Sequence, residues 1–341
     1  MIVGPRALPV SSPMTRLQAD LLLLFAAAIW GFAFVFQKTA MASVGPFAFI
    51  AARSLVATFA LAPLALLEVR GRRPRERGVE AVSRQPVALA VADVSPHASG
   101  ISPLAYGVVP LVRIAAAGGV AFFVAAALQQ WGLITATVTN ASFLTALYVV
   151  IVPFLGWLAY RAPPTPVVWL AAGLSFLGIW LLGGGTLGGF AAGDGLVALS
   201  ALFWAVHLLV TARASDIGLP VAFTCLQFAV VALLATLAAV ATEVVTLAGL
   251  LAAWKEIAYV GLLSSALTFT LLALALRHAP PGEAAILVST ENLFAALAGA
   301  LLLDERLPAI GWAGAGVIMA AILLVQWAVH RRDRVPAAAC S

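Results

Sequence analysis

Two charged residues lie deep inside long apolar stretches: Arg53 within residues 47–69 and Glu291 within residues 284–303. An ionisable side chain at the centre of a bilayer costs about 2.5–3.5 kcal/mol on insertion scales, so it is a functional candidate by default. A carboxyl group that is neutral in one state and ionised in another can carry a proton in each cycle, and burial disfavours its charged form. Arg53 is the candidate counter-charge. Its alternative role is structural, with the guanidinium reaching outward or binding backbone carbonyls.

Aromatic residues form a second set of candidates. Trp30 and Trp204 each fall about 15 Å along an apolar run, close to the middle of a bilayer. Such rings can line a cavity and stack on a ring or a cation, although ordinary helix packing explains most buried tryptophans. With Tyr148 and Asn292 they complete the candidate solute-binding set: Trp30, Tyr148, Trp204, Glu291 and Asn292.

The other polar residues suggest structure rather than chemistry. Gln129, Gln130 and Asn140 lie toward the outer ends of apolar runs, where they can join helices by hydrogen bonds. His207 and Gln227 are embedded but isolated, so packing is the favoured role. The four histidines are scattered and neither cysteine has a partner at ligand spacing. We therefore expect no catalytic residue, metal site or cofactor.

Composition identifies the solvent of this chain as lipid. Of its 341 residues, 63% are hydrophobic and 10% are charged, whereas a soluble domain is about 45–50% apolar and about 25% charged. The formal net charge of +5 comes from arginines in loops, without a basic stripe interleaved with aromatics. We expect the bilayer and a small-molecule solute as partners and no nucleic acid, and the sequence carries no signal of oligomeric state.

Ten stretches approach the 17–25 apolar residues that a membrane-spanning helix needs. The predicted fold class is therefore all-α, a polytopic membrane protein. The ten spans are residues 21–42, 47–69, 114–134, 137–160, 166–182, 196–212, 221–241, 257–276, 284–303 and 309–329. The first resembles a secretory signal but lacks a convincing cleavage site, and we expect it to be retained.

The distribution of basic residues predicts orientation. With the N-terminus in the cytoplasm, fifteen of the nineteen lysines and arginines fall inside; Lys38, Lys255 and Arg306 fall outside and Arg53 within a span. This satisfies the positive-inside bias and predicts a plasma-membrane protein with both termini cytoplasmic. The basic loop at 71–110 is expected to be a cytoplasmic insert that fixes topology, with anionic lipid binding as the alternative. Residues 1–18 and 331–341 are expected to be tails, the former disordered.

The two halves of the chain resemble each other. At an offset of 174, Asp20 falls on Asp194 and Trp30 on Trp204; at an offset of 143, Tyr148 falls on Glu291 and Trp169 on Trp312, among other matches. The long basic loop accounts for the difference between the offsets. Two five-helix repeats follow, at 19–185 and 190–330. Because five is odd, the second repeat enters the membrane from the opposite side and the repeats are inverted.

Several motifs, in order, resemble the drug/metabolite transporter superfamily of the EamA type. They are Trp30-Gly31-Phe32-Ala33-Phe34, Ala52-Arg53, Thr139-Asn140-Ala141-Ser142-Phe143-Leu144 with Pro153, Gly193-Asp194-Gly195 with Trp204, and Glu291-Asn292-Leu293-Phe294-Ala295-Ala296 with Asp304-Glu305. The resemblance implies a secondary transporter of a small metabolite or drug-like solute, an exporter or exchanger that works by alternating access around a midplane cavity. A membrane-embedded enzyme and a channel are the alternatives.

Overall fold

Helices joined by short turns and loops make up the part of the chain that the structure describes. The computed structural model describes residues 14–71, 108–161, 163–182, 184–185, 191–304 and 309–334. The first half contains α1 (Arg16–Ala40), α2 (Pro46–Gly71), α3 (Val108–Gly132), α4 (Val138–Thr145), α5 (Tyr148–Tyr160) and α6 (Pro166–Leu182). The second contains α7 (Asp194–Ser215), α8 (Pro220–Thr242), α9 (Leu247–Ala252), α10 (Trp254–Ala258), the π-helix η2 (Tyr259–Leu267), α11 (Thr268–Ala275), α12 (Pro281–Val288), α13 (Glu291–Leu302) and α14 (Ala309–Arg334).

Eight helical segments in this described part are long and apolar enough to cross a membrane. Three of these segments each consist of consecutive helical elements: α4 and α5; α10, η2 and α11; and α12 and α13. The remaining two expected spans correspond to α6 and α14, whose apolar helical stretches, Pro166–Leu181 and Ala309–Val325, are shorter. A multi-pass membrane protein is therefore established, while the count of ten spans stays a prediction.

The first and last helices extend beyond the expected boundaries with the two tails. Residues 16–18, expected to belong to a disordered tail, form the first turn of α1, because Thr15 and Gln18 make a capping box there. At the other end α14 continues to Arg334, beyond the expected boundary at residue 330. Residues 1–13, most of the basic loop at 71–110 and the last seven residues lie outside the described ranges.

Two of the expected spans are interrupted near their middle. The first breaks between α4 and α5 at Ala146 and Leu147, and the second between α12 and α13 at Ser289 and Thr290. Neither break contains proline. At the second, the hydroxyls of Ser289 and Thr290 donate to carbonyls three residues earlier, at 2.7 and 2.8 Å. Side-chain bonds of this kind compete with the helical ladder and help a helix to bend.

The two broken helices match in register as well as in form. Adding the sequence offset of 143 to the bounds of α4 gives the bounds of α12, and adding it to the first residue of α5 gives the first residue of α13. The repeat read from residue types is thus also present in helix boundaries.

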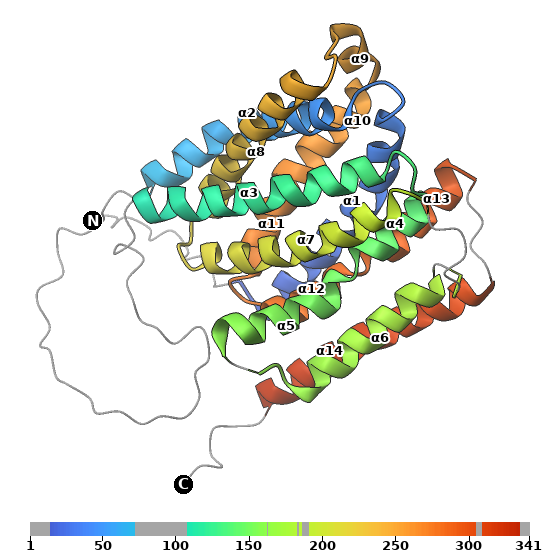
Figure 1. Ribbon diagram of the computed structural model, residues 1–341. Helices are drawn as coiled ribbons and strands as arrows, with labels where there is room; N and C mark the ends of the chain where they lie inside the picture. The colour runs from blue at the N-terminus through green and yellow to red at the C-terminus, as the bar shows by residue number, and fades with distance from the viewer. Residues whose placement is uncertain are drawn as a thin grey trace, which may run out of the picture.

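Helices α2 and α8 form an antiparallel pair along one side of the molecule, and α6 and α14 a pair along the opposite side (Figure 1). In the first pair each helix supplies a carboxylate to the N-terminus of the other. Glu243 accepts from the backbone N–H groups of Phe47 and Ala48, and Glu68 accepts from those of Val221 and Ala222, in each case with one bond of 2.8 Å. Carboxylates satisfy free N–H groups and complement the helix dipole. Helices α1, α3, α4, α5, α7, α11, α12 and α13 lie between these pairs (Figure 1).

Candidate functional site

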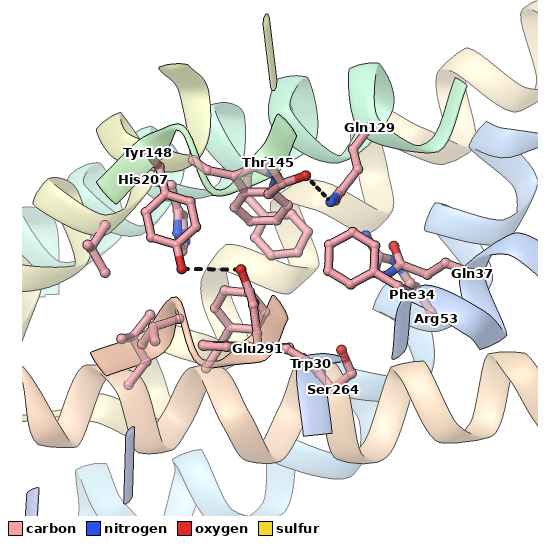
Figure 2. A pocket seen from close by; sticks show the side chains of 16 residues that line it. Trp30, Phe34, Gln37, Arg53, Gln129, Thr145, Tyr148, His207, Ser264 and Glu291 are labelled. Atoms are coloured by element: carbon pink, nitrogen blue, oxygen red, sulfur yellow. Dashed lines mark hydrogen bonds between the residues drawn. The ribbon is translucent and has the colours of Figure 1, made fainter. Parts of the chain in front are cut away.

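A cavity of about 80 Å³ lies among the central helices of the bundle (Figure 2). Side chains from both repeats line it, supplied by α1, α2 and α3, by both broken helices, and by α7, η2 and α11. Sites for drug-sized ligands enclose about 300–1,000 Å³. In this conformation the cavity therefore suits a small solute or must widen to admit a larger one.

The helix breaks present their residues to this cavity. Thr145 and Val288 end α4 and α12, while Tyr148 and Glu291 begin α5 and α13, and all four line the wall. The hydroxyl of Tyr148 donates to Oε1 of Glu291 at 3.2 Å, and Figure 2 shows this bond across the cavity. The carboxyl of Glu291 is thus held by one bond in a site otherwise lined mainly by apolar groups.

Aromatic rings form much of the remaining wall. Phe122, Trp204 and Phe269 pack together, with the ring centroid of Phe122 5.0 Å from each of the other two. Trp30 joins them, 4.9 Å from Phe269, and donates its indole N–H to the carbonyl of Ser264 at 2.9 Å. This cluster offers an apolar surface that stacks on a flat or aliphatic group.

Polar side chains lie at both ends of the cavity. Figure 2 shows Arg53 and Gln37 beside each other at one end, while Tyr148 and His207 lie toward the other end with Glu291 between. Arg53 is 4% exposed. Its guanidinium lies 5.8 and 5.6 Å from the rings of Phe49 and Phe122. Cation and carboxyl therefore line the same cavity.

Half of the cavity's lining residues are repeat partners of one another. The pairs Trp30 and Trp204, and Phe34 and Leu208, are separated by 174 positions; the pairs Thr145 and Val288, and Tyr148 and Glu291, by 143. Tyr148 and Glu291 are also hydrogen-bonded to each other. The cavity is therefore lined by equivalent positions of the two halves of the chain.

Five of the six residues singled out from sequence line the cavity: Trp30, Arg53, Tyr148, Trp204 and Glu291. Asn292 is not among the lining residues. It is fully buried, and its Nδ2 donates at 2.8 Å to the carbonyl of Ser289, which also accepts from the backbone N–H of Asn292 at 3.2 Å. This bond lies at the helix break, and the expected contact of Asn292 with solute stays a prediction.

Sequence reasoning missed other members of the wall, notably Phe122, Phe269 and His207. His207, assigned to packing, does contact Gln227 at 3.0 Å, but its ring also lines the cavity. These helices are apolar on most faces, so no amphipathic stripe reveals which side points inward. The spacing of Trp204 and His207, three apart on one helix, was the available signal.

Polar contacts that join the two repeats were also missed. Arg16 pairs with Asp20 at 2.8 Å and with Glu283, on α12, at 3.0 Å. At the equivalent positions of the other repeat, Asn140 of α4 donates to Asp194 of α7 at 3.4 Å. Both contacts tie an unbroken helix to the start of a broken one. They lie near opposite ends of the bundle, since Arg16 and Asp194 are in the first turns of α1 and α7.

Comparison with known proteins agrees with this two-part organisation. Residues 17–184 and 191–327 each match the sequence model of the EamA-like transporter family. A protein of Archaeoglobus fulgidus, named as an uncharacterized transporter, is 27% identical over 316 residues, which cover 91% of this chain and 86% of that protein. A solved crystal structure aligns with a TM-score of 0.66 over 94% of this chain and all of its own, at 16% identity. The last likeness concerns the fold alone.

Proposed function

This chain belongs to the EamA-like transporter family, and we propose that it is a secondary carrier that moves its small solute by alternating access. The family match confirms the resemblance seen in the motifs and gives the coarse function, membrane transport of a small solute. The observation that carries the finer proposal is the cavity at the repeat interface, lined by four pairs of equivalent residues. Secondary transporters built from inverted repeats bind near the bilayer midplane in such a place, beside interrupted helices.

The proposal also covers the direction of transport, the membrane and the topology of the chain. The carrier works as an exporter or exchanger in the plasma membrane, its two five-helix repeats are inverted, and both termini are cytoplasmic. The reciprocal capping of α2 and α8 supports a two-fold relation between the repeats, because Glu243 and Glu68 act on equivalent N-termini. The positive-inside distribution of arginines supports the orientation.

Counterflow tests the carrier directly. Purified protein is first screened for thermal stabilisation by small metabolites, since a ligand that binds only the folded state raises the midpoint temperature of unfolding. Each stabilising compound is then loaded into proteoliposomes, and we expect it to accelerate entry of the same labelled compound. Chemical conversion of the compound would indicate an enzyme instead. Flux that is indifferent to unlabelled compound on the far side would indicate a channel.

Orientation is tested by accessibility. In a protein lacking Cys225 and Cys340, we expect a cysteine at Lys255 to react with an impermeant thiol reagent applied to intact cells. A cysteine at Arg161 is expected to react only after the cells are opened. Both positions are exposed on the surface of the bundle. Labelling of residue 161 alone in intact cells would reverse the orientation.

The ionic contact of Arg16 is expected to close the cytoplasmic end of the cavity. Removing the cation from a partly buried ionic contact leaves charge uncompensated. In Arg16→Gln the carboxylates Asp20 and Glu283 lose the cation that joins them, which favours separation of α1 from α12. We expect a cysteine at Leu208 to react several-fold faster from the cytoplasmic side in this variant. Arg16→Lys keeps the charge and is the control; equal rates in all three proteins would contradict a closing role.

A further inference from the structure

The cavity contains hydrogen-bond donors that lack acceptors. Nε and Nη2 of Arg53 are buried, and neither has a hydrogen-bond partner in the described part of the chain. The indole N–H of Trp204, on the same wall, is in the same condition. An unpaired buried donor costs about 1–3 kcal/mol, and more when it is charged. These groups need an acceptor that the protein does not provide.

Arg53 also lacks a fixed counter-charge. In the described part of the chain Arg53 has no carboxylate within 4 Å, and the ion pairs of Arg16 with Asp20 and Glu283 do not involve it. The rings of Phe49 and Phe122 flank the guanidinium, and such contacts contribute about 0.5–2 kcal/mol. The two rings partly stabilise the positive charge, but they accept no hydrogen bond from the N–H groups that lie in the guanidinium plane. The planar fork of an arginine matches a carboxylate, which accepts two parallel bonds.

We propose that the transported solute is an organic carboxylate with an apolar body. Its carboxylate binds Arg53, and its body rests on the aromatic wall formed by Trp30, Phe122, Trp204 and Phe269. This rests on the proposed carrier function and names the class of solute for the same cavity. A cationic solute is disfavoured, since it would share a small apolar space with an unpaired guanidinium. The cavity widens on binding, as its volume of about 80 Å³ and the enclosed donors of Arg53 require.

The acidic group in the cavity sets a condition on this binding. Glu291 lies on the same wall, so an ionised Glu291 and a bound carboxylate would place two like charges in a site of low dielectric. Bound anion therefore favours the protonated form of Glu291, and by linkage protons favour anion binding. The other titratable side chains that face the cavity are Arg53, Tyr148 and His207. The solute thus travels with one proton.

Matched acid and amide probes test the proposal on the full-length protein. Benzoate, phenylacetate, butyrate and hexanoate are each compared with the corresponding amide by thermal stabilisation in detergent. We expect at least one acid to stabilise the protein while its amide, equal in shape but uncharged, does not. We also expect the stabilisation to weaken as the pH rises. Amides as effective as acids, or no response to any acid, would overturn the proposal. Sodium phosphate is included, and an equal response to it would contradict the need for an apolar body.

Substitutions at Arg53 locate the binding. Arg53→Gln is expected to weaken the affinity for the responding acid about 10- to 100-fold, the range for a hydrogen bond to a charged group. Arg53→Lys, which keeps the charge without the fork, should weaken it less. Arg70→Gln removes an exposed arginine from the same helix and should bind as the wild type does. Undiminished affinity in Arg53→Gln would overturn the assignment; if that variant does not fold, Arg53→Lys and the acid-amide comparison decide.

The experiments can disprove the carrier function and the class of solute separately. If counterflow reveals a neutral or cationic solute whose transport survives in Arg53→Gln, the carrier stands and the carboxylate proposal is wrong. If acids bind through Arg53 but show no counterflow, the binding site stands and the carrier function is wrong.

Discussion

Replacing Glu291 with glutamine is expected to abolish transport driven by a pH gradient. Glu291 is the one carboxylate among the described residues that line the cavity. Glutamine has nearly the same shape and can still accept the bond from Tyr148, but it cannot gain or lose a proton. In proteoliposomes with an imposed pH gradient, the wild type should accumulate labelled solute above its outside concentration, whereas Glu291→Gln should only equilibrate it.

Exchange separates coupling from binding in this experiment. Swapping labelled for unlabelled solute across the membrane needs no net proton movement, so we expect Glu291→Gln to retain it and to lose its dependence on pH. Asp216→Asn is the control, since Asp216 is exposed at the end of α7 and outside the cavity. Accumulation by Glu291→Gln at the wild-type rate would make Glu291 a structural residue and place coupling elsewhere.

Much of the architecture could be predicted from apolar length alone. Helices are nearly obligatory in lipid, because each backbone polar group must be satisfied within its own segment. The expected apolar stretches accordingly coincide with helices in the described ranges. The repeat offsets of 174 and 143 were readable from Trp30, Trp204 and Tyr148, and the match of two chain segments to one family model agrees with them.

The interruptions of the helices were not readable. Ala146, Leu147, Ser289 and Thr290 include no proline and no glycine, the residues that usually announce a break. What favours these breaks is local competition for carbonyls and tertiary packing, for example the amide of Asn292 on the carbonyl of Ser289. The sequence also proposes this amide as a binding group, and adjacency to Glu291 does not reveal which way its side chain turns.

The cavity residues that the sequence predicted best were those with a charged side chain inside an apolar stretch. Arg53 and Glu291 stood out because charge is rare in apolar runs, and both reached the wall. Phe122 and Phe269 gave no such signal, since phenylalanine is ordinary there. No residue pattern indicated the π-helix Tyr259–Leu267 either, although its Ser264 carbonyl accepts a hydrogen bond from the indole N–H of Trp30.

Replacing Gly31 with alanine is expected to disable the carrier by forcing two helices apart. A Cβ at this position would lie 2.6 Å from the carbonyl oxygen of Glu291 and 2.7 Å from the backbone nitrogen of Ala295. These are backbone atoms, so no side-chain rotation relieves the overlap and α1 must separate from α13. The separation moves Trp30 and Glu291, which flank this contact and both line the cavity.

The cost of this overlap is expected to appear in both stability and function. Overpacking costs about 1–3 kcal/mol, so the thermal midpoint in detergent should fall and the initial rate of exchange should drop about tenfold, the factor equivalent to 1.4 kcal/mol. Gly316→Ala in α14 is the matched control, because a Cβ there meets no atom within 4 Å. It should leave transport unchanged and keep or raise the midpoint, since alanine favours a helix over glycine. Equal behaviour of the two variants would show that the close approach of α1 and α13 is not needed to form the site.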